Sequence, residues 1–125
     1  MTLPPDALSA GVINMPDLLA RVDDDAELLG ELFEIFAEEF PRLSSLLTEA
    51  VEAQDMAAAE KAAHTLKGML ANLSAESAAE ALGAVEAAAR ARNQPDLATT
   101  FAAIDTPLAR LNTVIDACLA GEAIP

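Results

Sequence analysis

One long stretch of this sequence, from Leu28 to Val51, repeats its apolar residues at the spacing of an α-helix. The stripe comprises Leu28, Leu29, Leu32, Ile35, Phe36, Leu43, Leu46, Leu47 and Val51. Positions three and four apart share one helix face, so this stretch predicts a helix over about 25–53 with one buried side. Alanine supplies much of the other apolar content, whereas aromatic residues make up only 3% of the chain. Since alanine favours helices and aromatic residues favour strands, we predict an all-α fold.

Four further helices are predicted from capping residues and prolines. Their approximate bounds are 16–22, 55–73, 74–92 and 95–120. Asp55 and Ser74 are the expected N-caps of the second and third of these, and Gly121 is expected to end the last. Proline inside a helix removes one donor and crowds the preceding turn. The long helix should therefore kink or split at Pro41, and the last should bend at Pro107.

These elements predict a single domain, an antiparallel up-down four-helix bundle with a short N-terminal capping helix. The expected organisation is an N-terminal leader over 1–14, the bundle over 15–121 and a C-terminal tail over 122–125. Met15, Leu18 and Leu19 on the short helix can either cap the bundle or form part of an apolar docking patch, and we favour the cap. A bundle complete within one chain makes a monomer the expected state. Met1 and the short leader favour a free-standing protein over an excised domain.

Charge and cysteine content narrow the functional classes. Seven Lys and Arg against 21 Asp and Glu give a net charge of -14. A surface of that sign repels phosphate backbones and anionic lipid heads, so we expect neither nucleic acid nor membranes as partners. Cys118 is the single cysteine, no Cys/His spacing is typical of a metal site, and no apolar run of about 18 residues occurs. The sequence therefore predicts a cytoplasmic protein with no bound metal or cofactor.

The only histidine, His64, lies in a segment whose apolar stripe excludes it. That stripe comprises Ala59, Ala63, Leu66, Leu70 and Leu73. At about 100° per residue, His64 lies roughly 140° from the centre of the stripe. It shares its face with Ala57, Lys61, Gly68 and Ala71. We therefore predict an exposed imidazole rather than a packed core histidine.

Lys67 and Gly68 lie one turn beyond His64. The Lys67 ammonium can offset charge on phosphoryl oxygens and disfavours protonation of the ring, which keeps the ring nucleophilic. A glycine inside an exposed helix costs about 1 kcal/mol relative to alanine, so Gly68 needs a reason. Bare backbone there, flanked by the small Ala57 and Ala71, lets a second protein approach the ring. Close helix packing at Gly68 is the alternative, and Lys61 is either a second docking cation or a solvated surface residue.

The hexapeptide Ala63-His64-Thr65-Leu66-Lys67-Gly68 resembles the signature of histidine-containing phosphotransfer (HPt) domains of two-component phosphorelays. The resemblance covers about residues 15–120. It implies that His64 reversibly accepts a phosphoryl group, that Lys67 holds its oxygens and that Gly68 permits docking. The implied partners are response-regulator receiver domains, which bring their own magnesium, and a hybrid histidine kinase is a further candidate. Glu86 lies near the position at which some members place a polar residue that hydrogen-bonds the histidine ring.

The resemblance implies a phosphoryl carrier without kinase activity of its own, and the sequence contains no Gly-rich nucleotide loop. The alternative function is a non-catalytic helical-bundle adaptor in which His64 is incidental. A His- or metal-dependent hydrolase is the weakest hypothesis, because one histidine without Cys or His partners makes a poor ligand set or base system. The cognate kinase and receiver, the direction of transfer and the signal are not encoded in any recognisable motif.

Overall fold

The computed structural model describes residues 12–120, and every regular element in that range is an α-helix. The helices are α2 (Met15–Arg21), α3 (Ala26–Glu52), α4 (Met56–Asn72), α5 (Glu76–Arg90), α6 (Gln94–Ala103) and α7 (Asp105–Leu119). The predicted all-α class is confirmed. Gly121 and the tail over 122–125 lie outside the described residues, as do the first eleven residues of the expected leader.

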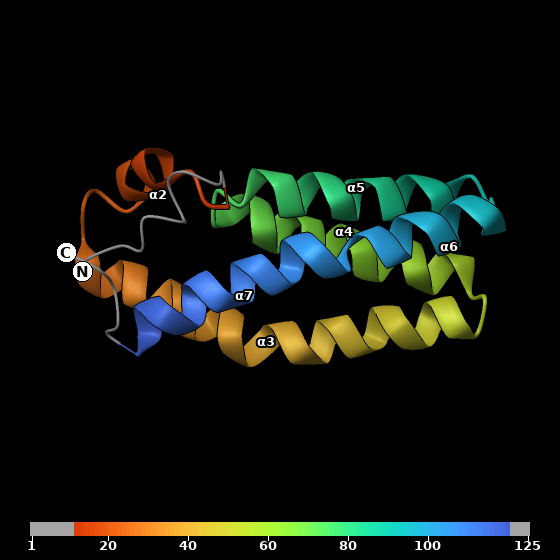
Figure 1. Cartoon of the computed structure of the whole chain (residues 1–125), viewed down its shortest axis with the longest axis horizontal. Coiled ribbons are helices and arrows are strands. Elements are labelled where there is room, and N and C mark those ends of the chain that lie inside the picture. Colours follow the sequence, from red (N-terminus) through yellow and green to blue (C-terminus); the bar gives the residue numbers. More distant parts are fainter. Residues whose placement is uncertain (1–11, 121–125) are drawn as a thin grey trace.

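The long helices lie side by side along one axis (Figure 1). Helix α4 packs against α5 on one side and against α3 on the other, while α6 and α7 follow one another along α5 and α3. The core between them contains aliphatic side chains and two phenylalanines, Phe33 and Phe36, each at most 1% exposed. The stripe predicted on α4 is buried as expected: Ala59, Ala63, Leu66, Leu70 and Leu73 are all at most 3% exposed.

Helix α2 lies across one end of the molecule, beside the turn between α4 and α5 (Figure 1). Met15 and Leu18 are buried in the core and Leu19 packs against it, so this helix caps the bundle rather than forming a separate docking patch. The two residues before Asn14, Val12 and Ile13, are buried as well. The end of the expected leader therefore belongs to the packed structure.

Of the two N-caps expected among the described residues, Asp55 is confirmed and Ser74 is not. Asp25 and Asp55 accept hydrogen bonds from the first turns of α3 and α4. The prediction that Ser74 caps the next helix is wrong, because Ser74 has φ 56° and ends α4 in the left-handed conformation. Its hydroxyl instead donates to Asp17 Oδ2 at 2.6 Å, tying α2 to the bundle. Arg92, at φ 55°, takes the same left-handed conformation after α5, which therefore ends at Arg90 and not at residue 92.

The two internal prolines have different consequences. Helix α3 runs unbroken from Ala26 to Glu52 through Pro41, so it does not split there. The single helix predicted over 95–120 is instead two helices, α6 and α7, separated at Ile104. Pro107 lies in the first turn of α7, where its missing N–H needs no partner. Proline crowds the carbonyl four residues before it, which here belongs to Ala103, the last residue of α6. The break therefore precedes the proline rather than falling on it.

The apolar stripe of α3 is wider than the surface that the other helices cover. Leu29, Phe36 and Leu47 are buried, but Ile35 remains 56% exposed and Leu46 remains 46% exposed. The sequence pattern overstated the buried face, because it cannot show how far a neighbouring helix reaches around α3. Of these two exposed residues, Ile35 lines a groove beside His64.

Candidate functional site around His64

Helix α4 directs His64 away from the core, as its register predicts. The His64 side chain is 68% exposed. The residues expected to share its face, Ala57, Lys61, Gly68 and Ala71, are exposed as well. A ring in this position is open to a large partner on its outer side.

The inner side of the ring meets a buried carboxylate from the next helix. His64 Nδ1 lies 2.8 Å from Glu86 Oε2, and the Glu86 side chain is 5% exposed. Since an ionised carboxylate can only accept, Nδ1 carries the proton and donates it to Glu86. In the neutral ring, the lone pair then resides on Nε2, the nitrogen that Glu86 does not contact. The pair thus fixes both the tautomer and the orientation of the imidazole.

Glu86 is kept ionised by cations on both sides. Lys67 Nζ donates to Oε1 at 2.5 Å, and Arg90 Nη2 donates to Oε2 at 2.9 Å. The hydrogen bond from Lys67 holds the pKa of the Glu86 carboxyl below its usual value of 4.5, and that from His64 acts in the same direction; burial opposes both. Glu86 is therefore a charged acceptor at neutral pH and not a proton donor to the ring.

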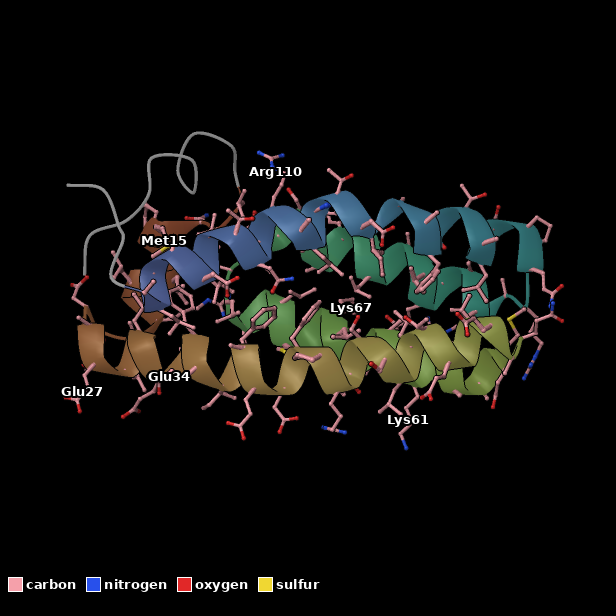
Figure 2. All side chains as sticks on the ribbon, turned by 60° about the horizontal axis from the view of Figure 1, so that its bottom comes forward. Met15, Glu27, Glu34, Lys61, Lys67 and Arg110 are labelled. Carbon is pink, nitrogen blue, oxygen red and sulfur yellow. The ribbon has the colours of Figure 1, made fainter. Side chains whose placement is uncertain are left out.

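Lys67 and Lys61 differ in their surroundings. Lys67 reaches across to α5 and passes beside Gly83: a Cβ at Gly83 would lie 3.4 Å from Lys67 Cδ, in ordinary van der Waals contact. Its ammonium is engaged with Glu86, a partner that sequence analysis did not assign to it. Lys61 points outward into solvent (Figure 2) and, within residues 12–120, forms no ion pair.

Gly68 faces open space. A Cβ placed on it would meet no heavy atom within 4 Å of the described structure, apart from its own helix and chain neighbours. Close packing of another helix against Gly68 is therefore not the reason for this glycine. The open space agrees with the prediction that the missing side chain at Gly68 leaves room for a second protein.

Two hollows meet at His64. The first is an apolar groove between α3 and α4, lined by Leu32, Ile35, Phe36, His64, Thr65, Gly68, Met69, Asn72 and Leu73. The second is a charged recess between α4 and α5, lined by Ala57, Glu60, Lys61, His64, Glu86 and Arg90. Ala71 lines neither. The ring therefore stands between an apolar surface and a charged one.

Arg90 and Glu60 also belong to this cluster, although the sequence did not predict them as parts of it. Arg90 Nε donates to Glu60 Oε2 at 2.9 Å while its Nη2 reaches Glu86. A signal existed, because Glu60 lies four residues before His64 and Arg90 four residues after Glu86, the spacing that places side chains on one helix face. The pairing of α4 with α5 that brings the two pairs together required the tertiary structure.

Other chemistries find little support in the part of the chain that the structure describes. No three His, Cys, Asp or Glu side chains in that part come together as metal ligands. Cys118 is buried, and burial raises the pKa of its thiol, which makes it a poor nucleophile. None of the described helices has the length and apolar character needed to cross a membrane.

Comparison with known proteins identifies the class. The model of the Hpt domain family matches residues 31–117, a span that includes His64, Lys67, Gly68, Glu86 and Arg90. This chain belongs to the Hpt domain family, whose members are phosphoryl carriers of two-component signalling and not kinases. Neither a curated protein nor a solved structure gave a significant match.

Proposed function

We propose that His64 of this Hpt domain accepts a phosphoryl group from the aspartyl phosphate of one receiver domain and passes it to another. The observation that carries the proposal is the hydrogen bond from His64 Nδ1 to the buried Glu86, which leaves Nε2 as the exposed nucleophile. The scaffold we infer is an antiparallel up-down four-helix bundle, in which α6 and α7 together form the fourth member. It is a cytoplasmic carrier, and a hybrid histidine kinase can stand upstream of it.

In the accepting step, the Nε2 lone pair attacks the phosphorus of the aspartyl phosphate. The Nε2–P bond forms as the bond between phosphorus and the carboxyl oxygen breaks, and that electron pair returns to the partner's aspartate as a carboxylate. The imidazole becomes positively charged while keeping its proton on Nδ1. Glu86, already in place and ionised, offsets this charge as it develops. No proton has to be removed from Nε2, so the chain needs no general base.

Lys67 is the phosphate-stabilising residue in this proposal, and the receiver domain supplies magnesium. The ammonium lies one helical turn from His64 and is 38% exposed, so it can leave Glu86 for the phosphoryl oxygens. Lys61, also beside the ring in the charged recess, is a docking cation for an acidic partner. Ala57, Gly68 and Ala71 have minimal side chains, so little protrudes from the exposed face of α4 where a partner would dock.

The apolar groove beside His64 is the proposed seat of the receiver domain. Ile35 from α3 and Met69 from α4 line it together with Gly68, so a partner that covers the groove also covers the ring. Removal of an exposed apolar residue such as Ile35 from water favours formation of the complex. The groove therefore favours a receiver surface with apolar side chains of its own.

The test is transfer of radiolabelled phosphoryl from a panel of phosphorylated receiver domains to the wild type and to His64→Ala. We expect acid-labile, base-stable label on the wild type alone. An adaptor bundle in which His64 is incidental predicts the contrary: no label from any receiver, and binding that is indifferent to His64→Ala. Because the His64 side chain is largely exposed, the variant should melt at nearly the wild-type temperature, which separates loss of the nucleophile from loss of the fold.

A further inference from the structure

Arg90 connects two carboxylates that lie on different helices. Its Nε donates to Glu60 Oε2 on α4 at 2.9 Å, and its Nη2 donates to Glu86 Oε2 on α5 at 2.9 Å. The second contact is made to the same oxygen that accepts the His64 Nδ1 proton. The guanidinium has a planar set of fixed donors, so it can hold both carboxylates at once, which an ammonium cannot do with the same geometry.

The proposed transfer changes the charges around Glu86. Before transfer the buried carboxylate contacts two cationic side chains, Lys67 and Arg90, in addition to the His64 ring. When Lys67 turns toward the phosphoryl oxygens, Glu86 loses the partner that most lowers its pKa. A carboxylate that is 5% exposed is costly to leave without a cation, so the remaining partner becomes important at that moment.

We propose that Arg90, restrained by Glu60, is a positioning residue that holds Glu86 beneath the imidazole while Lys67 serves the phosphoryl group. This inference rests on the proposed function of His64. It gives the two cations separate roles, since Lys67 changes partners during transfer whereas Arg90 does not. Glu60 supports this separation, because its bond to Nε restrains the guanidinium whose Nη2 contacts Glu86.

The separate roles predict different effects in the two states of the protein. In the unphosphorylated protein, Lys67 still holds Glu86 when Arg90 is removed, so the ring should keep its Nδ1–H tautomer. In the phosphorylated protein, Arg90 alone should hold Glu86, so its removal should weaken the bond between the Nδ1 proton and the carboxylate. A residue that merely stabilised the fold would change both states alike.

The experiment compares Arg90→Met with Arg110→Met, which makes the same charge change on α7, at the opposite edge of the molecule from Lys61 in Figure 2. Both proteins are phosphorylated with phosphoramidate, a small-molecule phosphoryl donor, so that no receiver is needed. Nitrogen-15 NMR then reports the ring directly, because His64 is the only histidine. We expect the Nδ1 proton of phosphorylated Arg90→Met to exchange with water about tenfold faster than in the wild type, equivalent to about 1.4 kcal/mol. The unphosphorylated spectra and Arg110→Met should match the wild type.

Transfer kinetics provide the second readout. Transfer from a phosphorylated receiver should fall about tenfold in Arg90→Met, a loss of about 1.4 kcal/mol in the transition state. Arg90→Lys should recover part of the rate, since it restores the charge but not the bridge, and Glu60→Gln should cause a smaller loss. The Arg90 side chain is 64% exposed, so these variants should fold.

Equal Nδ1 exchange in phosphorylated Arg90→Met and Arg110→Met would overturn the inference, as would a tautomer already lost before phosphorylation. Transfer that is as fast in Arg90→Met as in the wild type would overturn it too. Failure of the proposed function has a different signature, namely a wild type that takes no label from any receiver. Even if no receiver transfers label, the Nδ1 exchange rate of the protein phosphorylated with phosphoramidate still tests whether Arg90 holds Glu86.

Discussion

Glu86 is the residue on which the proposed chemistry of His64 depends. Burying a carboxylate is unfavourable unless donors surround it, and three side chains from two helices do so here: His64, Lys67 and Arg90. The arrangement gives the carboxylate two roles. It orients the ring, and in the proposed transfer it offsets the charge that the ring acquires.

The lowered pKa of Glu86 has a consequence for stability against acid. A carboxyl whose pKa is lower in the folded than in the unfolded protein adds to the free energy of unfolding above its usual value of 4.5. That contribution is lost as the pH falls through the folded pKa. We therefore expect the free energy of unfolding of the wild type to fall relative to that of Glu86→Gln as the pH is lowered from about 6 to about 3.5, because the other acids are common to both proteins.

Urea unfolding at the two pH values measures this difference. Asp17, whose pKa is lowered by the Ser74 hydroxyl and by Arg21, contributes to the acid loss of both proteins and so cancels in the comparison. An equal loss in the wild type and in Glu86→Gln would show that the Glu86 cluster does not contribute. The variant should also transfer phosphoryl more slowly at neutral pH, because a neutral amide cannot offset charge on the ring.

At the scale of elements, α3 and α4 together define the surface beside the ring. Helix α4 supplies the ring and bare backbone at Gly68, and α3 supplies apolar side chains that no other described helix covers. Substitution of Gly68 on α4 or of Ile35 on α3 should affect docking without affecting folding. Gly30 and Leu46, both on α3, are the matched control positions.

Gly68→Gln tests access to the ring, with Gly30→Gln as its control. Neither position has a heavy atom within 4 Å of an added Cβ, with its own helix and neighbours left out, so both substitutions should be tolerated by the fold. Each should raise stability slightly, by about 0.5–1 kcal/mol, because glycine is a poor helix former. We expect transfer to collapse in Gly68→Gln alone. Loss of helicity or a lower melting temperature in Gly68→Gln would instead indicate a packing role.

Ile35→Asp tests the apolar groove, with Leu46→Asp as its control. The two side chains are 56% and 46% exposed on the same helix, but only Ile35 lines the groove beside His64. We expect Ile35→Asp to raise the receiver concentration needed for half-maximal transfer by about tenfold, as loss of roughly 1.4 kcal/mol of apolar contact would. Similar effects of both substitutions would place the docking surface elsewhere.

At the scale of the whole molecule, charge and packing oppose one another. The chain has seven basic residues against 21 acidic ones, and this net charge of -14 disfavours the compact state through self-repulsion. The Glu86 carboxylate at the centre of the site is only 5% exposed, so salt screens its contacts less than it screens the exposed acids. Screening should consequently stabilise the protein while leaving the site intact.

Thermal melting as a function of salt checks this balance. We expect the melting temperature to rise by a few degrees, about 2–5 °C, between about 20 mM and about 500 mM NaCl, where the screening length falls from over 20 Å to under 5 Å. Glu34→Gln, which removes one exposed acid from α3, should melt above the wild type at low salt and gain less from added salt. A melting temperature that falls with salt would mean that attractive ion pairs outweigh the repulsion.

The sequence alone determined the helical class, most helix bounds and the exposed face of α4, because these follow from local periodicity and capping. The register of Ala59, Ala63, Leu66, Leu70 and Leu73 was sufficient to predict that His64 faces outward. Local rules failed at the boundaries between adjoining helices. Ser74 ends α4 in the left-handed conformation instead of capping α5, and the last predicted helix breaks at Ile104, ahead of Pro107, instead of bending at the proline.

Only the tertiary structure decided what surrounds the ring. Glu86 was a weak candidate in the sequence because it lies 22 residues from His64, and nothing local places its carboxylate 2.8 Å from Nδ1. The packing of α4 against α5 sets that distance, turns Lys67 toward the same carboxylate and brings Arg90 between Glu60 and Glu86. A helix fixes contacts three and four residues apart, whereas contacts between helices depend on which faces bury together. The sequence therefore predicted the candidate nucleophile, and the fold decided how its ring is held.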